Sequence, residues 1–410
     1  MNWFIIVASC LFLSGCAAGG TVGKDVSADD YEKANATIKA MMARESAEIK
    51  PAQASGDLKI SVLSNGTPKS KRIQVQGSEE TQYELNIPIG ASLNMDCYLT
   101  EGMSSPAVIL KTVFDGIVKV PQIASVQIKT VNADILKNMG FIYLEAEYLT
   151  KEKKFGTAKI LAASNMKVSF YCTHDELGYQ KTFMSVADSV AKSAYVQKFM
   201  KDFSGYDKKQ IDIISVKNMS VGYAESYQFS GNENADKKIA FSSFLIPRTT
   251  KEILTVDSVD RSVYDRETGN LLSGEYYSYQ NNEEEHNIAF EQVSGTKYHV
   301  QGELKGQKFS QSFESERPLV YSGFLLDQYS AGKTSKKEQN FEEYVTLSPS
   351  KPVKSRIAFK EKMPNGNKKI EYSFHTAKAS MELDEKSYTE INLDLGSAPL
   401  LIKREYFETR

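Results

Sequence analysis

The feature that most constrains the fold is a series of short runs in the second half of the chain, in which apolar and polar residues alternate. Alternation with a period of two places the apolar side chains on one face of a β-strand. The clean runs are Tyr298/Val300, Phe309/Phe313, Ile357/Phe359, Ile370/Tyr372/Phe374 and Ile391/Leu393/Leu395. Turn dipeptides separate such runs at intervals of about ten residues. They are Thr268-Gly269, Asn281-Asn282, Ser294-Gly295, Lys305-Gly306, Ala331-Gly332 and Asn365-Gly366.

A sheet with one apolar face must close or curl over something, and residues 205–410 offer few helix candidates to cover it. We therefore expect this part of the chain to form an antiparallel meander, either a half-barrel or a sandwich. The boundary with the preceding domain is placed at Ser204-Gly205.

Residues 51–204 combine strand and helix patterns. Strand-like alternation begins at Leu58 and returns at Val126–Thr130, Gly140–Leu149 and Lys167–Cys172. Asn65-Gly66 lies between two alternating runs and predicts a hairpin with a loop longer than two residues. An apolar stripe with helical spacing then predicts a long helix that packs on the preceding sheet. Its residues are Phe183, Val186, Val190 and Ala194, continuing toward Phe199 and Phe203. Strands followed by a closing helix predict an α+β domain.

Some of this stripe, Thr182–Ser193, resembles the closing helix of PsbP/Mog1-type domains. The resemblance transfers no functional residue.

The first residues form a candidate targeting signal. The apolar run Trp3–Leu13 would span about 16 Å as a helix, far short of the roughly 30 Å hydrocarbon core of a membrane. A signal-peptide core fits this length. The segment Leu13-Ser14-Gly15-Cys16 resembles the bacterial lipobox, although Met1-Asn2 carries no Lys or Arg.

The lipobox resemblance implies cleavage between Gly15 and Cys16 and lipidation, such as by palmitate, of Cys16. An ordinary signal peptide with a chance Cys is the alternative. Because Ala17 stands where Asp would resemble a retention signal for the inner membrane, we expect attachment to a bacterial outer membrane, on its periplasmic face.

Residues 1–15 are thus interpreted as a signal peptide and 16–50 as a lipidated tether with a spacer helix. Ser27 and Asp30 form a capping pattern at the start of this helix. Its apolar stripe runs from Tyr31 to Ile49, Glu45 interrupts it, and Pro51 ends it.

Two cysteines remain once Cys10 is lost with the signal peptide and Cys16 is lipidated. Cys97 and Cys172 each lie on the apolar face of an alternating run. Export to an oxidising compartment favours a disulfide between them, which would stabilise the fold by about 4–5 kcal/mol in the chain-entropy model. Two buried reduced thiols are the alternative.

Composition and motifs exclude several functions. The 50 basic and 52 acidic residues give a formal charge of -2, which argues against nucleic acid as a partner. The chain contains no GxSxG, GxGxxG, HExxH or CxxC motif. Gly19–Lys24 superficially resembles a phosphate loop but lacks its Ser/Thr and a preceding strand. His174 and His286 are interpreted as solvated loop and hairpin-tip residues, and His299 and His375 as ordinary strand positions. We expect no cofactor, no metal and no catalytic activity.

Aromatic residues crowd the middle of residues 205–410. The simplest interpretation is sheet packing. The functional interpretation is a concave surface facing a ligand, with Tyr276, Tyr279, Tyr298, Tyr321 and Phe324 as candidate ligand-binding residues. Leu319–Leu326 is apolar on both strand faces and is expected to be a central strand or the lip of a pocket. The polar segment Ser330–Gln339 could form a lid beside it.

The leading hypothesis is a non-catalytic, membrane-anchored lipoprotein of the envelope that acts as a binding or scaffolding module, with a protein or lipid partner. The alternative is a periplasmic carrier of lipids or amphiphiles, because the expected half-barrel is similar to Lol-type lipoprotein carriers, whose half-barrels hold acyl chains. A hydrolase with an unrecognised site is the third hypothesis. The similarity rests on architecture alone and carries over no residue.

Overall fold

The computed structural model describes residues 36, 39–46, 48–74, 81–90, 92–196, 205–231, 234–346, 348, 350–374, 377–394 and 399–410. The lipobox segment, most of the expected spacer helix and His375 lie outside them. The chain divides into two compact units. The N-terminal unit comprises Gly15–Phe203 and Leu245–Leu254, and the C-terminal unit comprises Ser204–Phe244 and Thr255–Arg410.

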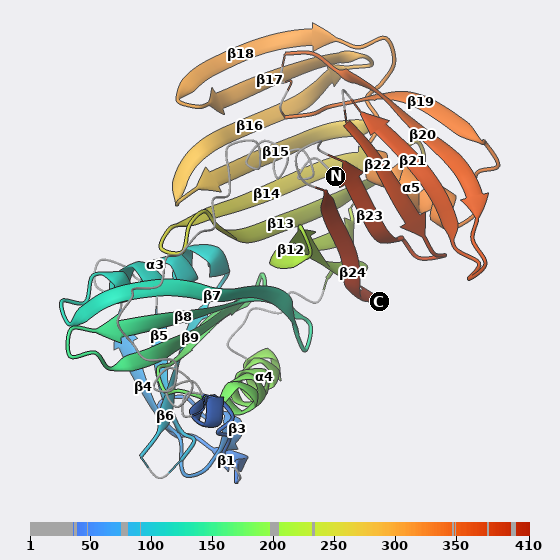
Figure 1. Ribbon diagram of the computed structural model, residues 1–410. Coiled ribbons are helices and arrows are strands. Elements are labelled where there is room, and N and C mark those ends of the chain that lie inside the picture. Colours follow the sequence, from blue (N-terminus) through green and yellow to red (C-terminus); the bar gives the residue numbers. More distant parts are fainter. Residues whose placement is uncertain are drawn as a thin grey trace. The chain divides into compact units, whose positions relative to one another are not determined.

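The N-terminal unit contains an eight-stranded sheet in the order β2-β4-β5-β6-β10-β9-β8-β7. Its strands are β2 (Ser55–Gly56), β4 (Lys69–Gln74), β5 (Thr81–Pro88), β6 (Asn94–Glu101), β10 (Val168–His174), β9 (Phe155–Ser164), β8 (Met139–Thr150) and β7 (Ile123–Leu136). The helices α3 (Pro106–Val118) and α4 (Gln180–Val196) lie on opposite faces of this sheet (Figure 1). Phe183, Val186 and Val190 of α4 belong to the main apolar core, which confirms the predicted packing of the helix on the sheet.

The predicted disulfide between Cys97 and Cys172 is present. The two residues are direct cross-strand partners on β6 and β10, in the middle of the sheet. The bridge joins the strands that precede α3 to those that follow it, and both cysteines are fully buried in the apolar core.

Three expectations for this unit need correction. Asn65-Gly66 does not close a hairpin, because β3 (Ser61–Ser64) pairs with β1 (Lys50–Gln53) whereas β4 pairs with β2 and β5. The spacer helix does not reach residue 49: residues 39–42 are helical, the chain then leaves the helix, and Pro51 lies within β1. Glu45 serves the long helix instead, since its carboxylate accepts hydrogen bonds from the Lys181 and Thr182 amides at 2.9 and 2.8 Å.

The C-terminal unit is built on one fourteen-stranded sheet in the order β18-β17-β16-β15-β14-β13-β12-β11-β24-β23-β22-β21-β20-β19. Its first half contains β11 (Lys208–Val216), β12 (Met219–Ser230), β13 (Ala235–Pro247), β14 (Ile253–Asp265), β15 (Leu271–Gln280), β16 (Glu283–Ser294), β17 (Lys297–Leu304) and β18 (Gln307–Glu314). Its second half contains β19 (Glu338–Glu343), β20 (Val353–Lys362), β21 (Lys368–Phe374), β22 (Ala377–Leu383), β23 (Tyr388–Asp394) and β24 (Leu400–Thr409).

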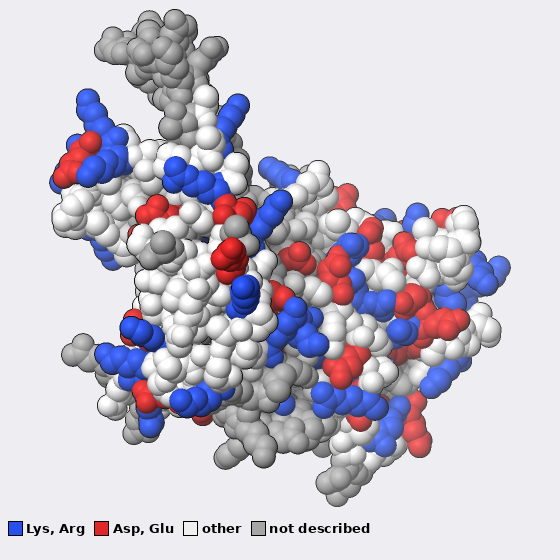
Figure 2. Space-filling model, turned by 90° about the horizontal axis from the view of Figure 1, so that it is seen from below, with Lys and Arg blue, Asp and Glu red and all other residues white. Residues whose placement is uncertain are grey.

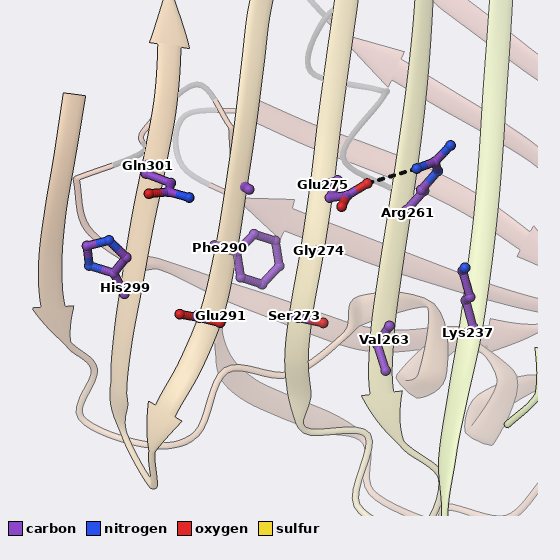
Figure 3. A pocket seen from close by; sticks show the side chains of 11 residues that line it. Lys237, Arg261, Val263, Ser273, Gly274, Glu275, Phe290, Glu291, His299 and Gln301 are labelled. Carbon is purple, nitrogen blue, oxygen red and sulfur yellow. Dashed lines mark hydrogen bonds and ion pairs between the residues drawn. The ribbon is translucent and has the colours of Figure 1, made fainter. Parts of the chain in front are cut away.

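The two halves are meanders that join where β11 pairs with β24. The sheet curls (Figure 1), so that strands of the second half cross those of the first half and lie behind them in the view of Figure 3. Among the described residues β18 and β19 are the two edges. The predicted antiparallel meander is therefore confirmed, as a single curled sheet. The predicted turns match it: Asn281 and Asn282, for example, both have positive φ in the tight β15–β16 connection.

The segment Leu319–Leu326 is not the expected strand. Residues from Ser322 to Ser330 form helix α5, which buries Leu325, Leu326 and Tyr329. The residues before the helix link the two halves of the sheet, since the Leu271 amide donates to the Leu319 carbonyl and the Val320 amide to the Glu342 carbonyl. The helix ends beside β21, where Lys368 donates to its last carbonyls. Helix α5 thus crosses one end of the curled sheet.

Candidate functional site

Charged side chains of both signs are mixed on the molecular face shown in Figure 2. A surface of one dominant sign would have pointed to a polyanionic or polycationic partner. The hollows of the C-terminal unit are therefore the better candidates for a site.

A cleft opens between α5 and the strands β11–β14, at the end of the curled sheet that the helix crosses. We call it the rim cleft. Its inner region has a volume of ≈ 30 Å³, and its outer region has a volume of ≈ 400 Å³. The inner region is lined by Lys208, Gln210, Ser226, Gln228, Lys238, Tyr264, Tyr321, Gly323, Asp327, Ser387 and Phe407. The outer region shares Lys208, Gln228, Tyr264, Asp327 and Phe407 with it and adds Asp236, Arg266, Phe324, Gln328, Ala331, Lys333, Glu385, Lys386 and Thr409.

One wall of the rim cleft is polar. Lys208, Gln228 and Lys238 are successive neighbours on β11, β12 and β13, because Lys208 pairs with Gln228 and Gln228 with Lys238. Side chains at directly paired positions lie on the same face of a sheet, so the three polar groups form a row across the strands. Lys208 forms an ion pair with Asp327 of α5 at 3.0 Å.

The other wall is aromatic. Tyr264 of β14 stacks on Tyr321, the N-cap residue of α5, with ring centroids 4.7 Å apart. Phe324 lies on α5, and Phe407 of β24 has the Arg404 guanidinium over its ring at 5.2 Å. A concave site with apolar rings on one side and a few placed polar groups on the other is the usual form of a small-molecule site.

A buried carboxyl lies next to the polar wall, two residues beyond Gln210 on the same face of β11. The Asp212 side chain accepts a hydrogen bond from Gln210 Nε2 at 2.7 Å and another from the Tyr388 hydroxyl. Burial raises the pKa of Asp212 to about 6, although both hydrogen bonds and the charges of Lys238 and Arg404 oppose the shift. Arg404 is itself paired with Asp384.

A second hollow lies on the opposite, outward face of β13–β17 and has a volume of ≈ 330 Å³ (Figure 3). Two of its four charged side chains, Arg261 and Glu275, form an ion pair at 2.9 Å, and the His299 ring lies between the Ser312 and Ser310 hydroxyls at 3.1 and 3.3 Å. It lacks an aromatic wall, since Phe290 is the one Phe, Tyr or Trp side chain that lines it and is itself buried. We therefore place the candidate site in the rim cleft.

The five aromatic residues that the sequence suggested do not form one site. Tyr321 and Phe324 line the rim cleft. Tyr298 is fully buried, and its hydroxyl accepts a hydrogen bond from the Leu319 amide at 2.9 Å. Tyr276 is buried beside His286, at a centroid distance of 6.4 Å, and Tyr279 is partly exposed on β15.

Sequence reasoning missed Lys208, Gln228, Lys238, Asp327 and Phe407. A detectable signal was the run of alternate polar residues on β11–β13. It was overlooked because inward-facing strand residues were assumed to be apolar.

Two histidines also differ from expectation. His174 is 4% exposed at the end of β10, with Nδ1 3.0 Å from the Asn94 carbonyl oxygen, and His286 is half-buried on β16 with Nδ1 2.7 Å from Ser278 Oγ. Burial lowers the pKa of both rings.

Within the described ranges, no group of three or more His, Cys, Asp or Glu residues is arranged to hold a metal ion. No helix in these ranges is long and apolar enough to cross a membrane.

Comparison with known proteins identifies no family. No family model matches the chain, and no curated protein matches it. Among solved structures, the chain is similar to a β-barrel-like protein from Brucella abortus, a domain of unknown function named DUF1849. The TM-score is 0.40 at 6% identity, and the match covers 50% of this chain and 98% of the other.

Proposed function

We propose that this protein is a non-catalytic binding protein of the bacterial envelope, held at the membrane by a lipid on Cys16, and that its rim cleft binds an amphiphile. The observation that carries the proposal is the division of the cleft into an aromatic wall and a polar wall. A molecule with an apolar chain and a polar head would satisfy both.

The fold supports an amphiphile in a second way. The outer region of the cleft, ≈ 400 Å³, falls in the usual size range of small-molecule sites and opens directly beside the exposed side chains of the rim. Burial of an apolar chain against Phe324 and Phe407 would contribute about 0.8 kcal/mol for each CH₂ group. A ten-carbon chain therefore suffices for measurable binding.

The test is a titration of the full chain, with Cys16→Ser to keep it free of detergent, against decanol and decanoate below their micellar concentrations. We expect both to bind in calorimetry. Phe324→Asp should weaken binding of both at least tenfold, because it places a charge in the aromatic wall. The matched control is Val293→Asp on β16, whose side chain is 63% exposed outside the cleft.

Absence of binding by either amphiphile to the folded protein would refute the proposal. If Phe324→Asp does not fold, as judged by its thermal transition, Phe407→Ala replaces it, with the same expectation of weaker binding.

A further inference from the structure

The inner end of the rim cleft contains an ammonium group that forms no ion pair with any residue that the structure describes. Lys238 Nζ lies 5.9 Å from the centre of the Tyr321 ring. Among the residues that the structure describes, no carboxylate lies within ion-pair distance of it, whereas the neighbouring cations Lys208 and Arg266 are paired with Asp327 and Asp236 at 3.0 and 2.8 Å. Lys238 is half-buried, so water compensates only a fraction of its charge.

The first turn of α5 faces the same inner space through Gly323. Its N-cap residue, Tyr321, supplies no side-chain hydrogen bond. Among the described residues, the Ser322 and Gly323 amides have no acceptor. Free amides at the start of a nine-residue helix carry partial positive charge and bind anions. The helix start and Lys238 therefore favour the same kind of group.

The charged side chains around the cleft also favour an anion. Five cationic side chains and three carboxylates line its two regions. Two of the carboxylates are taken by Lys208 and Arg266, which leaves Lys238, Lys333 and Lys386 with Glu385 alone. Asp212 and Asp260 are also buried nearby. Asp212 lies within range of the Lys238 charge but is hydrogen-bonded by Gln210 and Tyr388, and Asp260 is hydrogen-bonded by Ser262. Glu343 lies at the helix start but accepts from Ser355 and Tyr372.

The size of the inner region restricts the anion. A volume of ≈ 30 Å³ holds roughly two water-sized atoms, the size of the two oxygens of a carboxylate. An apolar chain does not fit there, but it fits the outer region beside Phe324 and Phe407.

We propose that the rim cleft binds a carboxylate-headed amphiphile head first, with the carboxylate between Lys238 and the first turn of α5 and the chain in the outer region. This inference rests on the proposed amphiphile function and names its ligand class.

The experiment compares decanoate, decanol and decyl phosphate on the full Cys16→Ser chain. We expect decanoate to bind more tightly than decanol and decyl phosphate. Lys238→Met should lower the affinity for decanoate about tenfold, the typical effect of losing one charge-assisted hydrogen bond, and leave the affinity for decanol unchanged. Lys238→Arg should keep the preference. Lys237→Met is the matched control, because Lys237 is the preceding residue of β13 and lines the outward hollow instead.

The outcomes separate the two proposals. Equal affinity for decanoate and decanol, or an equal loss of both in Lys238→Met, overturns the carboxylate site while the amphiphile function stands. Decyl phosphate binding as tightly as decanoate overturns the choice of headgroup. Failure of all three probes to bind removes the amphiphile function itself. Lys238→Gln repeats the test if the Met variant does not fold.

Discussion

Asp212 illustrates how a single buried carboxyl links the site to stability. Its pKa, raised to about 6, exceeds the ordinary value of 3.8, so the protonated form is favoured in the folded state. The stability that protonation contributes is complete below pH 3.8 and is lost as the pH rises through 6. The protein therefore retains an ionised buried carboxylate at neutral pH at a cost in stability.

We predict that the wild-type protein loses about 1.4 kcal/mol of unfolding free energy between pH 5 and pH 7.5 relative to Asp212→Asn, which does not titrate. Urea unfolding of both proteins at the two pH values measures the difference. Parallel pH dependence of the two proteins would show that Asp212 has an ordinary pKa.

Lys209 and Glu225 form a second buried pair on the same strands. Their side chains are 3% and 0% exposed, and Lys209 Nζ lies 2.5 Å from Glu225 Oε1. Burial raises the pKa of Glu225 even against the Lys209 charge. Removing only the cation leaves an unpaired buried carboxylate, which typically lowers the folding stability by about 3–5 kcal/mol.

We predict that Lys209→Met lowers the free energy of unfolding by about 3 kcal/mol or more. Adding Glu225→Leu should restore most of this stability, because the double variant then lacks both charges of the pair. Denaturant midpoints of the wild type, both single variants and the double variant complete the cycle. An additive double variant would contradict direct coupling between the two side chains.

At the scale of elements, the alternating pattern predicted strands well where one face is exposed. Ile370, Tyr372 and Phe374 on β21 all face the core, with partly exposed residues between them. The pattern fails on β11 and β13, where residues of both faces are buried. Alternation then no longer identifies the inner face, and Lys238 could not be assigned to it.

The helices α3 and α5 were missed for a related reason. Both lie between strands, and α5 has only nine residues, whereas α3 has 13. A local signal existed for α3, since Ser105 caps it through a hydrogen bond from the Val108 amide at 3.0 Å and Pro106 starts it. No such signal existed for α5, whose N-cap is Tyr321. The aromatic side of the site, Tyr321 and Phe324, was predictable from composition. Its polar side, Lys208, Gln228 and Lys238, left a signal in the alternate polar residues of β11–β13, but the buried residues on both faces of β11 and β13 hid which face is the inner one.

The disulfide belongs to the same scale, because it joins β6 to β10 across a sequence separation of 75 residues. We predict that Cys97→Ala/Cys172→Ala lowers the free energy of unfolding by about 4–5 kcal/mol, the loop-closure entropy for this length. Reductant should lower the stability of the wild type similarly and leave the double variant unchanged. Insensitivity of the wild-type transition to complete reduction would contradict a stabilising bridge.

At the scale of the molecule, the two ends of the C-terminal unit meet in the middle of its sheet. Lys208 at the start of β11 pairs with Thr409 near the chain terminus, so the first and last strands of the unit are neighbours. The rim cleft lies at this junction, and Lys208, Phe407 and Thr409 line it. The binding site therefore depends on the pairing of β11, near the start of the unit, with β24, near its end.

The segment Leu13-Ser14-Gly15-Cys16 motivates a lipid anchor, and several acyl chains are needed for stable membrane attachment, because one chain gives only marginal binding. Cys16→Ser should therefore abolish incorporation of labelled palmitate and move the protein from the membrane fraction to the soluble fraction. Cys10→Ser is the matched control, since Cys10 precedes the expected cleavage site and should change neither result. Persistent palmitate labelling of the Cys16→Ser protein would show that the anchor lies elsewhere.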